Sequence, residues 1–181
     1  MVKNSLNGPR AERLFASVVF AAGILGASAV VPVAAKQSVQ VPMSYPAGTI
    51  IISQHEHQLY FTNGDGTAIR YPVAIGKMGK AWGGKTYIEG KFIRPDWSPP
   101  AVVARDHPEL PSLIPGGAPN NPMGERALTL QLDQVAIHGT TQKMRKSVGT
   151  SASYGCIRML NEDVVDLYDR VSVGTPVVSI P

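Results

Sequence analysis

The chain has 181 residues, of which 44% are hydrophobic and 17% are charged, the balance of one folded globular domain. These values exclude a large multidomain machine and a disordered acidic chain. Without residues 1–35, which hold Lys3, Arg10, Arg13 and Glu12, the net charge falls from +4 to +2, which is too small to favour nucleic-acid binding. The 18 glycines and 15 prolines favour short strands and turns over a helical bundle.

The first 35 residues are predicted to be an export segment. Three basic residues precede an uncharged run over residues 14–35, which ends in Val33-Ala34-Ala35. This order is typical of a secretory signal peptide, and the run is also long enough to remain as an uncleaved membrane anchor. In both cases the basic residues keep the N-terminus inside, so we expect the rest of the chain outside the cytoplasm. Contact with the membrane is then limited to the uncleaved segment.

Residues 36–48 contain two prolines and little core material, which predicts a spacer before a domain that covers residues 49–181. Runs of β-branched and aromatic residues predict the strands of this domain, and Asn63-Gly64-Asp65-Gly66 predicts a hairpin between the second and the third. The predicted strands are 49–53, 58–62, 68–73, 91–94, 126–132, 135–137 and 176–180.

Two loops and one helix are predicted among these strands. Residues 74–90 are rich in glycine and basic, and residues 95–122 hold more than half of the prolines, so both stretches are expected to be mostly loop. Asn161 is a favourable N-cap for a helix that ends before Gly174, and its apolar residues line one face. The sequence thus predicts a mainly β domain with a long proline-rich loop and one short helix near the C-terminus.

Cys156 is the only cysteine and cannot form a disulfide within the chain. It is therefore either a small buried core residue or a working thiol. His138, 18 residues upstream at the end of a predicted strand, can serve as the base that a working thiol requires. Because Gly155 lets backbone amides approach a reacting carbonyl, the amides of Tyr154, Gly155 and Cys156 are candidate oxyanion donors.

Other polar residues give weaker indications. Arg158 would project to the same side as Cys156 in an extended segment, where it either recognises a substrate carboxylate or braces the loop. His55 and His57 form a His-x-His pair without a third ligand, so no metal site is predicted. His107 lies in the proline-rich segment and is expected to face solvent.

The stretches His138-Gly139-Thr140 and Ser153-Tyr154-Gly155-Cys156-Ile157-Arg158 resemble the signature of the L,D-transpeptidase catalytic domain, also called the YkuD domain. In that family a His-Gly-Thr is followed, after an interval that this chain matches, by Ser/Thr-His-Gly-Cys, a hydrophobic residue and Arg or Asn. Further landmarks of the family follow in the same order over about residues 49–181. They are residues 58–60, 71–73, 76–77, 97–100, 121–128 and 174–177.

The chain departs from the family pattern at two places. Tyr154 stands where the family commonly has histidine, and a tyrosine can donate a hydrogen bond but cannot carry a positive charge. Residues 85–90 replace a frequent Thr-Pro-x-Gly, which changes a loop rather than the chemistry.

The resemblance implies a mixed-strand, β-sandwich-like fold and an acyl transfer that starts from peptidoglycan stem peptides. It makes Cys156 the nucleophile, His138 the general base and acid, and the backbone carbonyl of Gly139 the group that orients His138. It implies neither a metal nor an organic cofactor, and it adds an envelope protein with an acceptor lysine as a potential partner. The implied oxyanion and substrate residues are Ser153, Tyr154, Gly155 and Arg158.

Two other functions remain open from the sequence. With Tyr154 in the motif, water can be the preferred acceptor, which would make the protein a stem-cleaving cysteine peptidase of the same fold. The other alternative is a catalytically silent peptidoglycan-binding domain, although a binding domain would not need both Cys156 and His138. The acceptor itself, a second stem, an envelope protein, a free D-amino acid or water, is not fixed by the sequence.

Overall fold

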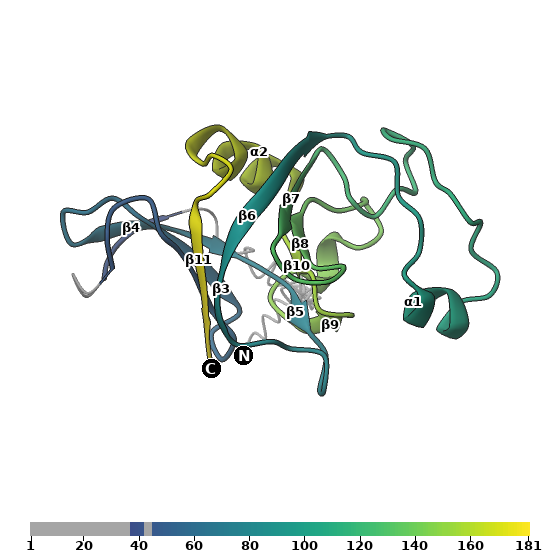
Figure 1. Ribbon diagram of the computed structural model, residues 1–181, viewed down its shortest axis with the longest axis horizontal. Helices are drawn as coiled ribbons and strands as arrows, with labels where there is room; N and C mark the ends of the chain where they lie inside the picture. Colours follow the sequence, from purple (N-terminus) through teal and green to yellow (C-terminus); the bar gives the residue numbers. More distant parts are fainter. Residues whose placement is uncertain (1–36, 42–44) are drawn as a thin grey trace, which may run out of the picture. The chain divides into compact units, whose positions relative to one another are not determined.

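The computed structural model describes residues 37–41 and 45–181 (Figure 1). The predicted export segment, residues 1–35, lies outside the described residues. No helix in the described part combines the length and the apolar character needed to cross a membrane. The strands are β1 Gln37–Gln40, β2 Ile50–Ser53, β3 Gln58–Thr62, β4 Thr67–Pro72, β5 Ile75–Gly76, β6 Gly84–Ile93, β7 Arg126–Leu130, β8 Ala136–His138, β9 Ser151–Ser153, β10 Ile157–Arg158 and β11 Pro176–Ile180. The helices are α1 Ala101–Asp106, the 3-10 turn Arg145–Ser147 and α2 Asn161–Arg170.

Nine strands join in the order β1-β4-β3-β2-β11-β6-β7-β8-β10, and β5 pairs with β9 separately. Most neighbours are antiparallel, but β11 runs parallel to β2 and β10 runs parallel to β8. The mixed, mainly β architecture predicted from the sequence is therefore confirmed. The predicted hairpin is also confirmed, since Gly64 and Gly66 have φ of 87° and 83° between β3 and β4.

The core lies between the sheet and helix α2. Its fully buried side chains are mostly branched aliphatic residues of the strands, which favour a pleated surface. Val164 and Leu167 of α2 are fully buried and belong to the same cluster, which confirms the predicted apolar face of this helix. The core thus supports β7 and β8, the two strands that lead to the candidate site.

Strand β6 begins at Gly84, seven residues before the predicted strand 91–94. This early start of β6 was not predicted because residues 74–90 are rich in glycine, although Thr86, Tyr87 and Ile88 are good strand formers. The register shifts between Ile88 and Gly90, and a Cβ on Gly90 would lie 2.9 Å from Oγ1 of Thr129. Glycine here therefore marks a bulge inside a strand rather than a loop.

The segment predicted as a spacer contains strand β1, which pairs antiparallel with β4 at the edge of the sheet. Most of β1 is exposed, which agrees with its low content of core material. Backbone pairing with β4 and a hydrogen bond from Arg70 to the Gln37 side chain place this strand, and neither requires a hydrophobic pattern in the sequence.

The proline-rich segment, residues 95–122, is mostly loop as predicted but also contains helix α1. The prediction of a single helix was therefore wrong. Pro100 precedes the helix, and the amides of Val103 and Ala104 donate to its carbonyl. None of the residues of α1 is buried, so its sequence lacks the apolar face that would have revealed it.

Candidate active site

Two adjacent strands bring the predicted histidine and cysteine together. His138 ends β8, and β10 runs parallel to β8 with Arg158 beside His138 and Ile157 beside Ile137. Cys156 immediately precedes β10. Because alternate residues of a strand face the same side, Cys156, Arg158 and His138 all reach one face of this pair.

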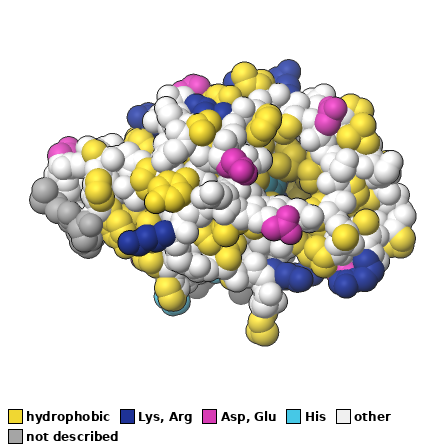
Figure 2. Space-filling model, in the orientation of Figure 1, with side chains coloured by type: hydrophobic (Ala, Val, Ile, Leu, Met, Phe, Trp, Pro, Cys, Tyr) yellow, Lys and Arg dark blue, Asp and Glu magenta, His cyan; other side chains and the backbone are white. Residues whose placement is uncertain are grey.

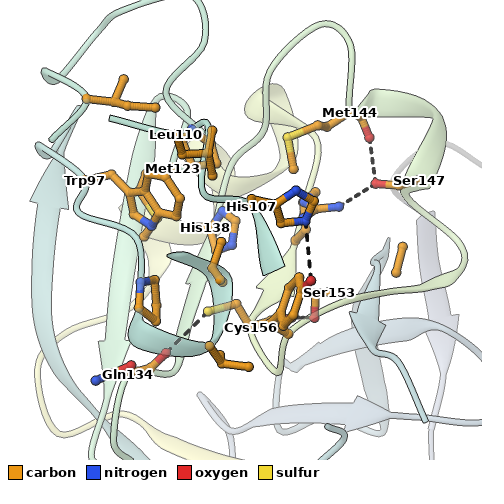
Figure 3. Close-up of a pocket in the computed structure, with 18 of the residues that line it drawn as sticks. Trp97, His107, Leu110, Met123, Gln134, His138, Met144, Ser147, Ser153 and Cys156 are labelled. Atoms are coloured by element: carbon orange, nitrogen blue, oxygen red, sulfur yellow. Dashed lines mark hydrogen bonds between the residues drawn. The ribbon is translucent and has the colours of Figure 1, made fainter. Parts of the chain in front are cut away.

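This face opens into a pocket of about 660 Å³. Figure 2 shows a hollow on this side of the molecule, with mostly hydrophobic side chains around it and a histidine visible inside. Of the predicted site residues, His138, Ser153, Tyr154, Cys156 and Arg158 line the pocket. Apolar side chains form much of the remaining wall, among them Trp97, Val103, Leu110, Met123, Val135 and Met144 (Figure 3).

His138 is held by the backbone that follows it. Its Nδ1 lies 2.8 Å from the carbonyl oxygen of Gly139, so Nδ1 carries a proton and donates to that oxygen. Burial and the nearby Arg158 cation lower the pKa of His138 to about 4. The imidazole is therefore neutral near pH 7, and its lone pair is on Nε2, the tautomer that can accept a proton.

The Cys156 thiol is half-buried and donates a hydrogen bond to the carbonyl oxygen of Gln134, with Sγ and O 3.6 Å apart. Burial raises the pKa of Cys156, although the amide of Ala136 and the charge of Arg158 act in the opposite direction. Figure 3 shows the Cys156 sulfur and the His138 ring in the same pocket. The resting site therefore holds a neutral thiol and a neutral imidazole rather than an ion pair.

The loop that presents the thiol is fixed by its own hydrogen bonds. The Ser153 hydroxyl donates to the carbonyl of Cys156 at 2.6 Å and accepts from the amide of Gly155 at 3.1 Å. Trp82 donates from Nε1 to the carbonyl of Gly155 at 3.1 Å. Gly155 has φ of 126°, which favours glycine. Since Ser153 already takes the Gly155 amide, the amides of Tyr154 and Cys156 remain as the candidate oxyanion donors.

Arg158 is 9% exposed, and no ion pair joins it to a carboxylate within the described residues. One guanidinium nitrogen donates to the Ser147 hydroxyl at 2.7 Å, while Nε is buried without a partner. The Ser147 hydroxyl donates in turn to the carbonyl of Met144 at 2.7 Å. A buried cation that lacks an anion is costly, and its presence in a pocket favours an anionic ligand.

His107 is exposed, as predicted, but it also lines the pocket together with Tyr154. Its Nε2 lies 3.4 Å from the Tyr154 hydroxyl, and the two rings meet edge to face with centroids 6.2 Å apart. The Tyr154 hydroxyl also donates to a carboxylate oxygen of Asp106 at 3.1 Å. The prediction missed this contact because the two segments are far apart in the sequence.

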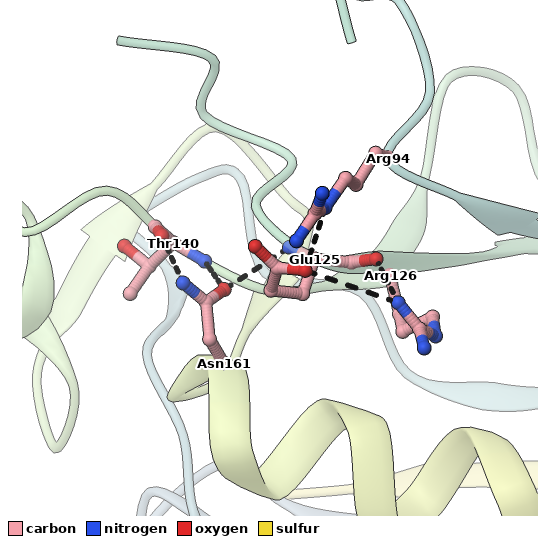
Figure 4. Close-up of polar contacts among 5 residues, drawn as sticks. All are labelled: Arg94, Glu125, Arg126, Thr140 and Asn161. Atoms are coloured by element: carbon pink, nitrogen blue, oxygen red, sulfur yellow. Dashed lines mark hydrogen bonds and ion pairs between the residues drawn. The ribbon is translucent and has the colours of Figure 1, made fainter. Parts of the chain in front are cut away.

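The sequence predicted Asn161 as the N-cap of helix α2, but the N-cap is Leu160. The side-chain oxygen of Asn161 accepts from the amides of Thr140 and Glu125 at 2.9 and 3.2 Å, and its nitrogen donates to the carbonyl of Thr140 at 2.9 Å (Figure 4). A Cβ on Gly139 would lie 2.2 Å from this oxygen. Asn161 therefore clamps the loop whose carbonyl orients His138.

The described residues contain no group of three or more His, Cys, Asp or Glu side chains that could hold a metal ion. His57 instead contacts the Ser151 hydroxyl, with Nε2 and Oγ 2.9 Å apart. One histidine of the His-x-His pair, His57, thus makes a structural contact.

The low pKa of His138 predicts a loss of stability in acid. The unfolded histidine has a pKa of about 6.5, so between about pH 6.5 and pH 4 the unfolded chain binds a proton that the folded chain does not. The free energy of unfolding should therefore fall by about 3 kcal/mol from pH 7 to pH 4 through this group. Urea unfolding at both pH values measures it: His138→Gln should lose about 3 kcal/mol less than wild type. His55→Gln, an exposed control, should lose as much as wild type.

A family model for the L,D-transpeptidase catalytic domain, YkuD, matches residues 47–178. The chain belongs to this family. The "Probable L,D-transpeptidase YbiS" of Escherichia coli K12 is 35% identical over 149 residues, which cover 78% of this chain and 47% of that protein. The "Probable L,D-transpeptidase ErfK/SrfK" of the same organism is 34% identical, over 71% of this chain and 42% of that protein. The chain thus spans about half the length of the curated L,D-transpeptidase relatives it matches.

Solved structures show the same fold. An L,D-transpeptidase from Mycobacterium smegmatis superimposes with a TM-score of 0.59 at 18% identity, over 74% of this chain and 58% of that one. A Brucella melitensis structure, named as a probable carnitine operon oxidoreductase, has a TM-score of 0.55 and 39% identity over 81% of this chain and 93% of that one. The chain therefore shares its fold with an L,D-transpeptidase to which it is only 18% identical.

Proposed function

We propose that the protein is a peptidoglycan L,D-transpeptidase that works by thiol acyl transfer. The observation that carries the proposal is the neutral His138, with its proton on the nitrogen that faces the Gly139 carbonyl, in the same pocket as the only thiol of the chain. Membership of the family and the names of the relatives support the substrate class. No cofactor is needed for this chemistry.

In the first half-reaction the Cys156 thiol turns from the Gln134 carbonyl toward Nε2 of His138 and gives it the proton. The sulfur attacks the carbonyl carbon of the L,D-peptide bond before the terminal D-Ala of a stem tetrapeptide. As the carbon–nitrogen bond breaks, the imidazolium returns the proton to the leaving amine, and D-Ala departs. The stem remains as a thioester. The low pKa of His138 makes its protonated form a good acid for this step.

In the second half-reaction an acceptor amine attacks the thioester and His138 takes its proton. As the carbon–sulfur bond breaks, the imidazolium returns this proton to the sulfur of Cys156, which restores the resting site. The side-chain amine of a second stem gives a 3-3 cross-link, and a lysine of an envelope protein gives protein anchoring. The amides of Tyr154 and Cys156 are proposed to stabilise the oxyanion of both tetrahedral intermediates. Because this chemistry requires peptidoglycan, we place the domain in the periplasm or cell envelope, with residues 1–35 as its export signal or anchor.

Arg158 is proposed to bind a carboxylate of the stem. Its guanidinium is buried, lacks a carboxylate partner within the described residues and lies on the same face as the thiol. Lys143 and Lys146 also line the pocket and add positive charge to it. A stem peptide carries several carboxylates, so this charge complements the donor substrate.

The test is product analysis by mass after the full-length protein has been incubated with purified tetrapeptide stems. We expect dimeric stems with the loss of D-Ala, and no product from Cys156→Ala. Trimmed monomers alone would make the protein a stem-cleaving peptidase. The absence of any product, together with retained binding of Cys156→Ala to sacculi, would establish a silent binding domain and overturn the proposal.

A further inference from the structure

The outer part of the proline-rich segment, residues 98–113, is here called the lid because it forms one wall of the pocket. Its residues at this wall are Pro100, Val102, Val103, His107 and Leu110. Figure 1 shows helix α1 of the lid at the far end of an excursion from the sheet. Since none of the residues of α1 is buried, packing into the core does not hold the lid in place.

The base of this segment is fastened independently of the lid. Trp97 and Ile114 exchange two backbone hydrogen bonds of 2.9 and 2.8 Å across the base. The buried Asn121 side chain donates to the carbonyls of Pro95 and Ile114 at 2.9 and 3.1 Å. These hydrogen bonds fix the base of the segment. Whether the lid covers the pocket therefore depends on the contacts that residues 98–113 make themselves.

Within residues 37–41 and 45–181, the hydrogen bonds that join the lid to the rest of the chain all end on one side chain, that of Tyr154. Its hydroxyl donates to Asp106 at 3.1 Å and lies 3.4 Å from Nε2 of His107. The Lys77 ammonium also lies over the Tyr154 ring, 3.8 Å from the ring centroid. Tyr154 thus connects the lid, the nucleophile loop and the loop after β5.

We propose that Tyr154 is a positioning residue whose hydroxyl latches the lid over the nucleophile pocket, and that this latch sets the size of the molecules that reach Cys156. The apolar lid residues then stand over the pocket while the latch is closed. Entry of a bulky reactant requires the hydroxyl to leave Asp106, whereas a small reactant can pass a closed lid. In this chain the motif residue before Gly155, Tyr154, therefore controls access to Cys156. It does so through its hydroxyl, which an imidazole at that position would not supply in the same geometry.

The chain offers a direct test because Cys156 is its only cysteine. Alkylation of the full-length protein is measured with iodoacetamide, which is small, and with fluorescein-5-maleimide, which is bulky. The ratio of the bulky to the small rate reports access. Tyr154→Phe keeps the ring, and with it the Lys77 contact, but removes the hydroxyl. We expect it to raise the ratio about fivefold, the effect of losing one hydrogen bond to a partly exposed carboxylate.

Asp106→Asn removes the charge at the other end of the latch and should raise the ratio to a similar degree. The double variant should not exceed Tyr154→Phe, because loss of the hydroxyl already removes its hydrogen bond to Asp106. Tyr60→Phe is the matched control: Tyr60 donates to the Glu56 carboxylate at 2.8 Å in an exposed hydrogen bond between residues that do not line the pocket. We expect its ratio to equal that of wild type.

Two results would overturn the latch. One is a ratio within a factor of about two of wild type in both single variants, which is smaller than the loss of a hydrogen bond produces. The other is an equal rise of the small and the bulky rates, which would place the effect on the thiol itself. Hydrogen exchange adds a second readout, in which amides of residues 98–113 should exchange faster in the variants and those of β7 and β8 should not. None of these measurements uses the transpeptidase reaction, so the latch and the proposed function fail separately.

Discussion

Replacement of His138 by glutamine is expected to slow acylation of Cys156 by about 10²–10⁴-fold at pH 7, the usual contribution of a general base. The resting thiol is neutral because burial raises its pKa, so it needs a base at the moment of attack. The Gly139 carbonyl holds the histidine in the tautomer that can take this proton. A solved structure of the L,D-transpeptidase LdtMt1 is named as a complex with imipenem. Imipenem is therefore the acylating probe, and the rate of adduct formation by intact-protein mass spectrometry measures the step.

The control for this variant is alkylation by iodoacetamide well above the pKa of the thiol. Under that condition the thiolate is already formed, and no base is needed. His138→Gln should then react within a factor of about three of wild type, since only the protonation step has changed. An equal loss in both assays would mean that the substitution has disrupted the pocket. Unchanged acylation at pH 7 would assign the base to another group.

Replacement of Arg158 by methionine is expected to lower anion recognition while the protein keeps its stability. Iodoacetate and iodoacetamide differ chiefly in the carboxylate, and both report on Cys156 alone. We expect the ratio of the iodoacetate rate to the iodoacetamide rate to fall about tenfold, because the cation beside the thiol is lost. The reaction with stem peptides should fall by a similar or larger factor.

Stability distinguishes this role from the alternative in which Arg158 braces the loop. The guanidinium is buried without a carboxylate partner in the described part of the chain, so its removal relieves a desolvation cost. The hydrogen bond to Ser147 is lost, but Ser147 keeps its bond to the Met144 carbonyl. The free energy of unfolding should therefore stay within about 1 kcal/mol of wild type. A fall of about 3 kcal/mol with an unchanged rate ratio would show a bracing residue instead.

Local patterns predicted most of the strands correctly. Strands β2, β3, β4 and β11 appear close to their predicted bounds, because their β-branched and aromatic runs end in clear turn residues. Strand β6 began earlier than expected, since glycines that form a bulge resemble a loop in the sequence. Helix α1 and strand β1 were missed because neither buries an apolar face, and burial is what periodicity reports.

The candidate site divides in the same way. That Cys156, His138 and Arg158 line one pocket could be predicted, because their residue types and spacing are typical of a thiol site. The side chains that hold them could not. Asn161 is an ordinary N-cap residue by local preference, but its amide reaches Thr140 across 21 residues of sequence. Whether a helix-start asparagine caps its own helix or a distant loop depends on what lies opposite, which only the folded chain decides.

The sequence by itself indicated the groups that we propose react: one thiol, an upstream imidazole with a glycine after it, and an arginine two residues beyond the thiol. These are properties of residue identity and short spacing. The tertiary structure alone decided the protonation state of the pair and the access to it. Burial sets the pKa of His138 and Cys156, and the contact of Tyr154 with Asp106 joins segments 48 residues apart. Both depend on which distant atoms exclude water from, or donate to, each group, and no local pattern contains that information.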